Sequence, residues 1–283
     1  MRVLVTGAAG QVGSEVAVTC QRAGDDVIAL GHAELDVGDR DAVLQAFVAC
    51  RPDAVVHAGA WTAVDACEGD PDRAWRVNAL GTRHVAEAAR RVDSHVLYLS
   101  TDYVFDGSKP APYTEWDPTN PRSVYGRSKL GGELELAGDP DATVMRTSWV
   151  CGANGPNMVK TVLRVAAEPG PLRFVDDQRG CPSFAADLAS MARRLLVERR
   201  PGTFHVTNQG AVSWFEFVRD ILEVAGLDPG RVVPISTAAL DPPRPAPRPA
   251  NSVLDNAALR LSGVPLLRDY REALSELVRQ LRA

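Results

Sequence analysis

The chain has 283 residues, of which 45% are hydrophobic and 24% are charged, and its formal net charge is −5. This composition is typical of a globular protein with one large domain or two smaller ones, and it excludes a disordered chain. The negative net charge argues against a broad nucleic-acid-binding surface. No apolar run approaches the roughly 18 to 20 residues of a membrane span, and the N-terminus does not resemble a signal peptide.

The cysteines and histidines carry little functional signal. The five cysteines are far apart and form no C-x-x-C pair, and the five histidines are scattered. Isolated thiols suit a reducing compartment, so we expect a cytoplasmic protein. The same spacing predicts no metal site.

The first half of the sequence alternates short β-branched runs with helical patterns. Strands are predicted at 3–6, 27–30, 54–58, 96–100 and 143–147. Helices are predicted between them: one that ends near residue 24, and others at 39–50, 71–92 and 123–136. Apolar strands that alternate with helices indicate a parallel sheet covered on both faces. We therefore expect an α/β fold with a Rossmann-type, doubly wound parallel sheet.

The second half is less regular. Helical patterns lie at 158–167, 185–198, 214–225 and 270–282, and short strands fit 172–175 and 203–206. Residues 241–250 contain five prolines and should form an extended loop. We expect residues 1–150 to form a dinucleotide-binding domain completed by parts of 158–206. Residues 151–283 should form mainly a smaller C-terminal substrate-binding region, with a cleft between the two.

A glycine-rich turn follows the first predicted strand. Gly7, Gly10 and Gly13 lie between this strand and a helix, at the start of a βαβαβ pattern. Glycines there allow a tight turn and let backbone amides approach a pyrophosphate, which the helix N-terminus also attracts. A turn that serves only packing is the alternative, but the context favours dinucleotide binding. The second strand ends at Leu30 without an acidic residue that would repel a 2′-phosphate, so we expect NADPH, with NADH as an alternative.

A tyrosine and a lysine lie four residues apart in the predicted helix 123–136. Tyr125 and Lys129 share one helical face, and Thr101 ends the fourth predicted strand. A nearby lysine cation favours the phenolate and lowers the pKa of a tyrosine, which then acts as a general acid. An exposed pair on a helix is the alternative reading of the spacing. The strand end and the glycine-rich turn together favour a catalytic triad of Thr101, Tyr125 and Lys129.

The G-x-x-G-x-x-G spacing resembles that of the extended short-chain dehydrogenase/reductase family. Longer stretches resemble the dTDP-4-dehydrorhamnose reductase family, at 58–65, 100–107, 146–150, 175–182 and 248–252. The resemblance implies NAD(P)H-dependent reduction of the C4 ketone of dTDP-4-dehydro-L-rhamnose to dTDP-L-rhamnose, for cell-envelope polysaccharide. It also implies that Tyr125 protonates the developing alkoxide. Lys129 would lower the pKa of Tyr125 and bind the nicotinamide ribose, while Thr101 hydrogen-bonds the carbonyl.

The resemblance extends to binding residues. It implies that the cofactor is bound by Gly7, Gly10, Gln11, Val12, Gly13, Asp36, Val37, Ala60, Trp61, Thr62, Tyr125 and Lys129. It implies that the substrate is bound by Thr101, Asp102, Tyr103, Trp149, Val64 and Asn157. Asn78 would shape the backbone of the site. Related dTDP-sugar 4,6-dehydratases carry a glutamate where this chain has Tyr103, so elimination of water is disfavoured.

Arg179 and Arg248 are candidates for a diphosphate clamp, because arginine binds phosphate bidentately. A solvated surface position is the alternative for each. Some family members are associated with Mg²⁺ through a glutamate in the first helix. Glu15 fits that position, but Ala186 stands where an acidic partner is expected, so we predict no metal.

Two other functions stay open at this point. The chain resembles reductases of other 4-keto nucleotide sugars, and it is also similar to the non-catalytic regulatory subunit of methionine adenosyltransferase. An intact Thr101, Tyr125 and Lys129 argues against the regulatory subunit, because a silent binding module needs no proton donor. The expected partner is a dTDP-sugar, with no nucleic acid and no membrane, and the chain is expected to be a monomer or a homodimer.

Overall fold

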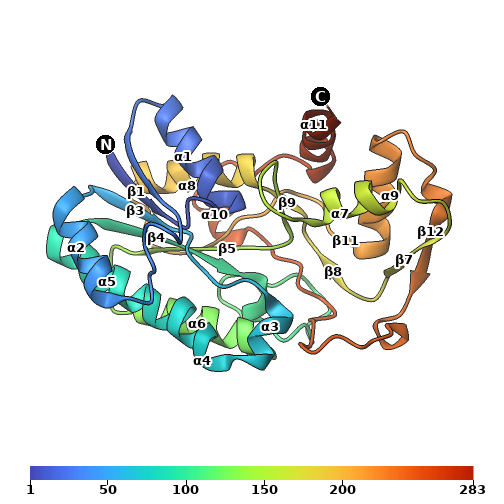
Figure 1. The fold of residues 1–283 in the computed structure, drawn as a ribbon, viewed down its shortest axis with the longest axis horizontal. Helices are drawn as coiled ribbons and strands as arrows, with labels where there is room; N and C mark the ends of the chain where they lie inside the picture. The colour runs from blue at the N-terminus through green and yellow to red at the C-terminus, as the bar shows by residue number, and fades with distance from the viewer. Residues whose placement is uncertain (283) are drawn as a thin grey trace.

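The computed structural model describes residues 1–282 and is built around a six-stranded parallel sheet (Figure 1). The strand order is β10-β5-β4-β3-β1-β2, and every pair is parallel. The strands are β1 (Arg2–Thr6), β2 (Asp26–Leu30), β3 (Ala54–His57), β4 (His95–Thr101), β5 (Thr143–Thr147) and β10 (Gly202–His205). The predicted Rossmann-type, doubly wound sheet is confirmed. The chain order reverses beside β1, and a crevice opens at the carboxyl ends of the strands at such a point.

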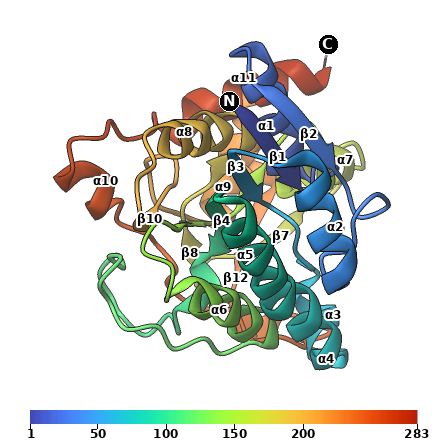
Figure 2. The ribbon, with the colours of Figure 1, turned by 90° about the vertical axis from the view of Figure 1, so that its left-hand side faces the viewer.

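Helices cover both faces of this sheet (Figures 1 and 2). One face packs against α1 (Gln11–Arg22) and α8 (Ala185–Val197), which also pack against each other. The other face packs against α2 (Arg40–Cys50), α5 (Gly81–Val92) and α6 (Val124–Leu136). Side chains of β1 alternate between these faces: Val3 and Val5 are buried in the first core and Leu4 in the second.

Local sequence signals set several helix boundaries. The Asp39 carboxylate accepts hydrogen bonds from the backbone N–H groups of Asp41 and Ala42, both at 3.1 Å, so it caps α2. The helix predicted over 71–92 is not uniform, since it consists of α4 (Pro71–Trp75), a π-helical turn (Arg76–Leu80) and α5. A short helix, α3 (Val64–Gly69), precedes it and was not predicted.

A second region lies beside the sheet, on the right in Figure 1, and has its own apolar core. Helices α7 (Met158–Val165), α9 (Trp214–Val224) and α11 (Tyr270–Arg282) pack around a parallel pair formed by β7 (Leu172–Val175) and β12 (Val232–Ile235). Shorter elements complete it: β6 (Val150–Cys151), β8 (Arg179–Gly180), β9 (Ser183–Phe184) and β11 (Val212–Ser213). The chain returns to the sheet with α8 and β10, and α10 (Ala257–Leu261) packs on β10. Residues 241–250 contain no helix or strand, as predicted.

Three chain-wide features concern membranes, metals and thiols. Within residues 1–282, no helix combines the length and apolarity needed to cross a bilayer. The same residues contain no group of three or more histidine, cysteine, aspartate or glutamate side chains placed to hold a metal ion. All five cysteines are free thiols, and four of them are buried.

Candidate active site

The glycine-rich turn between β1 and α1 has room for backbone but not for side chains. Gly7 has a φ of +64°, and a Cβ there would lie 2.6 Å from the Gly59 nitrogen. A Cβ on Gly13 would lie 2.3 Å from the Gly7 carbonyl oxygen. The turn therefore packs directly on the loop after β3 and leads into the N-terminus of α1, where backbone N–H groups have no partner within the helix. Such a cradle fits the diphosphate of a dinucleotide.

The end of β2 carries an acidic group that the sequence pattern did not reveal. The Glu34 carboxylate turns back and accepts a hydrogen bond from the Gly31 N–H at 2.9 Å. A Cβ on Gly31 would lie 3.2 Å from the Ala9 Cβ, so this carboxylate lies beside the glycine-rich turn. The sequence predicts no acid at the strand end, whereas the structure brings one back from three residues beyond Gly31. A carboxylate at this position would repel the 2′-phosphate that distinguishes NADPH from NADH.

The residues expected near the adenine ring are held by protein contacts. The Asp36 carboxylate accepts from the Gly38 N–H at 2.9 Å and from Arg76 Nη1 at 3.4 Å. Val37 is buried in the core beneath Gly81. Their contact with a cofactor stays a prediction.

Asn78 fixes the loop that follows β3. Its amide oxygen accepts from the Trp61 N–H at 2.8 Å, and its amide nitrogen donates to the Trp61 carbonyl oxygen at 3.1 Å. The same nitrogen donates to Ser128 Oγ of α6 at 2.9 Å. The side chain lies fully buried in the π-helical turn. It therefore holds the segment 60–62 against the helix that carries Tyr125 and Lys129.

The lysine of the predicted triad is buried, which excludes an exposed pair on a helix. Ser123 caps α6 by accepting from the Gly126 N–H at 3.1 Å, and Tyr125 and Lys129 then follow on one face. The Lys129 ammonium donates to the Leu99 carbonyl oxygen at 2.6 Å and lies 4.0 Å over the Tyr98 ring. Burial lowers the pKa of Lys129 to about 7, and the Glu133 carboxylate acts in the opposite direction.

Tyr125 differs from the expectation in its protonation. Burial raises the pKa of its phenol, and a hydrogen bond with Thr101 opposes that rise. The expected lowering of the Tyr125 pKa by Lys129 is therefore not found in the free protein. The phenol is protonated at neutral pH, which is the form that a proton donor needs.

Thr101, which ends β4, and the two residues that follow it gather around this phenol. The Thr101 hydroxyl donates to Asp102 Oδ1 at 3.0 Å and accepts from the Tyr103 N–H at 3.2 Å. The Tyr103 ring meets the Tyr125 ring edge-on at 5.6 Å. Burial raises the pKa of Asp102 to about 6, and its Oδ2 atom has no hydrogen-bond partner among residues 1–282. The predicted residues Thr101, Asp102, Tyr103 and Tyr125 are thus brought together.

Trp149 stacks on a residue that sequence analysis missed. Its indole lies parallel to that of Trp214 in α9, with ring centroids 3.5 Å apart and planes 5° apart. Trp149 has a φ of +47°, and Gly180 leaves the space beside its ring, since a Cβ there would lie 2.5 Å away. The stack joins the end of β5 to the second region. Val64, by contrast, packs with Tyr103 and Tyr125 on the sheet side.

The two candidate clamp arginines have different protein partners. Arg248 forms a bidentate ion pair with Asp65 of α3, at 2.5 and 2.8 Å. Its positive charge also lowers the pKa of Tyr103, although burial dominates and raises that pKa to about 12. Arg179 instead donates to Glu216 of α9 at 3.1 Å. The charge of Arg248 therefore acts on Tyr103, whereas Arg179 pairs with Glu216 of the second region.

Asn157 lies at the glycine-rich turn. Its Oδ1 atom caps α7 by accepting from the Lys160 N–H at 3.1 Å. Its Nδ2 atom donates to Gln11 Oε1 at 3.0 Å. The side chain therefore connects α7 to the first turn of α1, while its predicted substrate contact stays a prediction.

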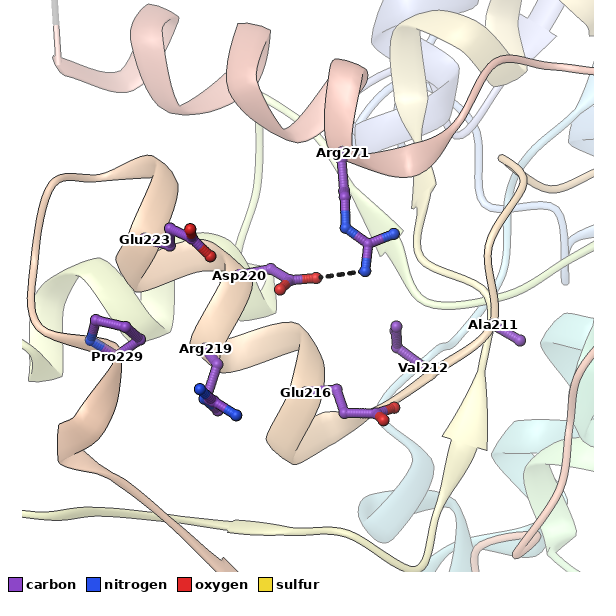
Figure 3. A pocket seen from close by; sticks show the side chains of 8 residues that line it. All are labelled: Ala211, Val212, Glu216, Arg219, Asp220, Glu223, Pro229 and Arg271. Atoms are coloured by element: carbon purple, nitrogen blue, oxygen red, sulfur yellow. Dashed lines mark ion pairs between the residues drawn. The ribbon is translucent and has the colours of Figure 1, made fainter.

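Two surface cavities lie away from these residues. One has a volume of about 280 Å³ and is lined by Ala211, Val212, Glu216, Arg219, Asp220, Glu223, Pro229 and Arg271. Figure 3 shows its mixed charges, with Arg271 and Asp220 paired at 3.3 Å. The other, of about 620 Å³, lies between α9 and α11. Neither cavity is lined by a predicted site residue. The candidate active site is therefore located by Thr101, Tyr125, Lys129 and the glycine-rich turn.

Comparisons with known proteins agree with this geometry. The chain matches the family described as RmlD substrate binding domain over residues 1–283. It is 43% identical to dTDP-4-dehydrorhamnose reductase of Streptomyces griseus, covering 97% of this chain and 92% of that protein. It is 44% identical to a probable dTDP-4,6-dihydroxy-2-methyloxan-3-one 4-ketoreductase of Streptomyces antibioticus, covering 98% and 94%.

A solved structure extends the match to three dimensions. The crystal structure of dTDP-4-dehydrorhamnose reductase from Bacillus anthracis in complex with NADP superposes with a TM-score of 0.94. The two sequences are 35% identical, and the match covers 99% of each chain. The family resemblance seen in the sequence is confirmed. By its fold, its full-length match and these relatives, the chain belongs to the RmlD substrate binding domain family and is an oxidoreductase.

Proposed function

We propose that this protein reduces the C4 ketone of dTDP-4-dehydro-L-rhamnose to dTDP-L-rhamnose, and so supplies rhamnose for cell-envelope polysaccharide. One observation carries the proposal. The hydroxyl groups of Thr101 and Tyr125 meet at the carboxyl end of β4, and the buried Lys129 ammonium binds the Leu99 carbonyl oxygen of the same strand, next to a turn fit for a dinucleotide. The relative from Streptomyces griseus, at 43% identity over nearly the whole chain, supports this substrate.

NADPH is the proposed hydride donor, and NADH is an alternative. The turn residues 7 and 10–13 would hold its diphosphate, Asp36 and Val37 would lie near the adenine, and the segment 60–62 would line the nicotinamide side with Tyr125 and Lys129. The relative from Bacillus anthracis was solved with NADP, which supports this choice. When bound, the cofactor supplies the hydride that reduces the ketone carbon.

The side chains of this protein supply the proton. Burial keeps the Tyr125 phenol protonated at neutral pH, so it can donate a proton to the ketone oxygen as hydride reaches the carbon. Thr101 would hydrogen-bond the same oxygen. The phenolate left behind would be stabilised by the Lys129 ammonium until solvent returns a proton. Tyr103 stands where related dTDP-sugar 4,6-dehydratases carry a glutamate, so elimination of water is disfavoured.

The second region would bind the rest of the substrate. The Trp149 indole, stacked on Trp214, would offer a flat apolar surface that suits a sugar ring, and Val64 and Tyr103 would contact the sugar from the sheet side. Arg248 would bind the diphosphate in exchange for the Asp65 carboxylate. Asp102, Asn157 and Arg179 complete the proposed substrate contacts.

The test is a direct assay with purified protein. Oxidation of NADPH and of NADH would be followed by the absorbance of the reduced nicotinamide, with enzymatically prepared dTDP-4-dehydro-L-rhamnose as substrate. The product would be identified by mass and NMR. We expect oxidation that depends on the ketone and yields dTDP-L-rhamnose. Saturable NADPH binding without turnover would contradict the proposal and favour a different ketosugar or the regulatory subunit.

A second candidate is reduction of another 4-keto nucleotide sugar. The relative from Streptomyces antibioticus, whose name indicates a different ketone, is as similar to this chain as the rhamnose enzymes are. The fold and the triad are shared by both reactions. Comparing kcat/KM for the two ketones decides between them.

We also propose a cytoplasmic enzyme that is a monomer or a homodimer. Its five free cysteines fit a reducing compartment. Cell fractionation and light scattering of the purified protein test these two points.

A further inference from the structure

A buried ion pair includes Glu133, which lies one helical turn after Lys129 in α6. Arg146 of β5 donates to the Glu133 carboxylate of α6 through two nitrogens, at 2.6 and 2.9 Å. Their side chains are only 7% and 8% exposed. Ser100 Oγ of β4 donates to the same carboxylate at 2.5 Å. One carboxylate thus connects a helix and two neighbouring strands.

Stability alone does not account for this pair. Removing two charges from water is costly, and replacing a buried ion pair with apolar residues of similar volume is often neutral or stabilising. The same helix-sheet interface is filled elsewhere by apolar side chains such as Leu136 and Val144. The charges therefore point to a role in the site rather than in packing.

The spacing connects the pair to Lys129. Glu133 follows Lys129 by four residues on α6, so both side chains lie on one face of the helix. The Lys129 ammonium donates to the carbonyl oxygen of Leu99, and the next residue, Ser100, donates to Glu133. Two adjacent residues of β4 therefore hold the lysine and the carboxylate in register.

Three titratable groups surround the Lys129 ammonium. Tyr98 of β4 lies beneath it, and burial raises the pKa of that phenol well above its usual value. His57 of β3 has a pKa lowered to about 3 by burial and then by Lys129. Neither changes charge near neutral pH. Glu133 is therefore the neighbour whose negative charge favours the protonated lysine.

We propose that Glu133, held by Arg146 and Ser100, is a positioning residue that keeps Lys129 charged and aimed at the cofactor ribose and the Tyr125 phenol. The inference rests on the proposed reductase function. In this proposal the Glu133–Arg146 pair sets the charge and orientation of Lys129.

The experiment uses a paired replacement and a control on the same helix. Glu133→Leu with Arg146→Met removes both charges and leaves neither one unpaired. The control is Glu135→Gln: Glu135 also receives two hydrogen bonds from an arginine, Arg83, at 2.7 and 2.8 Å. That pair is on the surface, with side chains 56% and 24% exposed. Each variant is measured for NADPH affinity against pH by fluorescence, for kcat/KM against pH, and for thermal midpoint.

The paired replacement should fold with a thermal midpoint at or above that of the wild type. Its NADPH affinity and kcat/KM should decline at a pH lower by about one unit, because Lys129 loses its proton earlier. We expect kcat to fall roughly tenfold. The step in the pH curves that comes from Asp102, near its pKa of about 6, should stay at the same pH. Glu135→Gln should leave every curve unchanged.

Wild-type pH curves and kcat in the folded paired variant would overturn the proposal. If that variant does not fold, Arg146→Lys decides the question, since it keeps both charges but loses the two-nitrogen contact. Arg146→Lys should lower kcat several-fold without moving the pH curves, and an unchanged kcat would also overturn the proposal. Because NADPH affinity is measured without substrate, a wild type that reduces no ketosugar would refute the proposed function and leave this test intact.

Discussion

The two regions that face each other across the site bury different chemistry. The sheet region buries charge next to the reacting groups, with Lys129, Asp102 and the Glu133–Arg146 pair. The second region buries aromatic and aliphatic side chains, and its charged pairs, such as Arg179 with Glu216, lie near the surface. Fixed charges stabilise charge that develops during a reaction, whereas aromatic surface supplies binding area. The sheet region should therefore control kcat, and the second region should control KM.

Tyr125→Phe should cause the largest effect. Loss of the proton donor should lower kcat by roughly 10²- to 10⁴-fold, while NADPH affinity stays near the wild-type value. Steady-state kinetics and fluorescence titration measure the two quantities. Tyr103→Phe, which alters the neighbouring ring, is the control and should lower kcat by less than about tenfold. Full activity in Tyr125→Phe would remove the proposed acid.

Asp102→Asn tests the buried charge of the sheet region through stability. Burial raises the pKa of Asp102 from 3.8 to about 6. Between these values the folded state keeps a proton that the unfolded state has released. The stabilising contribution of the protonated group is therefore complete below about pH 4 and is lost as the pH rises through about 6.

Asparagine resembles the protonated carboxyl group and does not ionise. The variant should exceed the wild type in free energy of unfolding by on the order of 2 kcal/mol at about pH 8, and by less at about pH 5. Chemical denaturation at the two pH values measures this difference. An equal difference at both would mean that Asp102 does not titrate in this range.

Trp214→Leu tests the second region. Removing the surface on which Trp149 stacks should raise the substrate KM by roughly tenfold, because the indole loses its fixed orientation. The value of kcat should change much less. Trp116→Leu is the matched control, since that indole is 67% exposed and lies outside the stack. If kcat falls while KM stays unchanged, the second region does not act mainly on KM, and the proposed difference between the two regions is wrong.

Glu34→Gln should have the smallest effect. The carboxylate at the end of β2 would repel a 2′-phosphate, so its neutralisation should raise the ratio of kcat/KM for NADPH to that for NADH by roughly threefold. Glu15→Gln, in α1, serves as the control. A ratio that does not move would place Glu34 outside the cofactor site.

Local patterns in the sequence predicted most of the fold. Strands 143–147 and 172–175 were predicted at their observed bounds, because continuous apolar runs between turn signals identify buried strands. The cap at Asp39 and the shared face of Tyr125 and Lys129 follow from spacing within one helix.

Contacts between distant residues were not predictable in this way. Asp65 and Arg248 are 183 residues apart, and nothing local to either identifies the other as its partner. Trp214 begins a predicted helix, and nothing in that local pattern indicates its stack on Trp149. Glu34 was missed because its side chain returns to a strand end that it does not adjoin in sequence.

The π-helical turn at 76–80 has a consequence for the phase of the helix that contains it. An α-helix turns each residue by about 100°, and a π-helical turn accommodates one extra residue. That extra residue lets Asn78 face the loop at Trp61 while Val85 and Ala89, further along, still face the sheet. Deleting one residue from the turn would rotate one of these two faces out of place. The length of this segment is therefore fixed by two surfaces at once, and insertions or deletions between Pro71 and Val92 should not be tolerated.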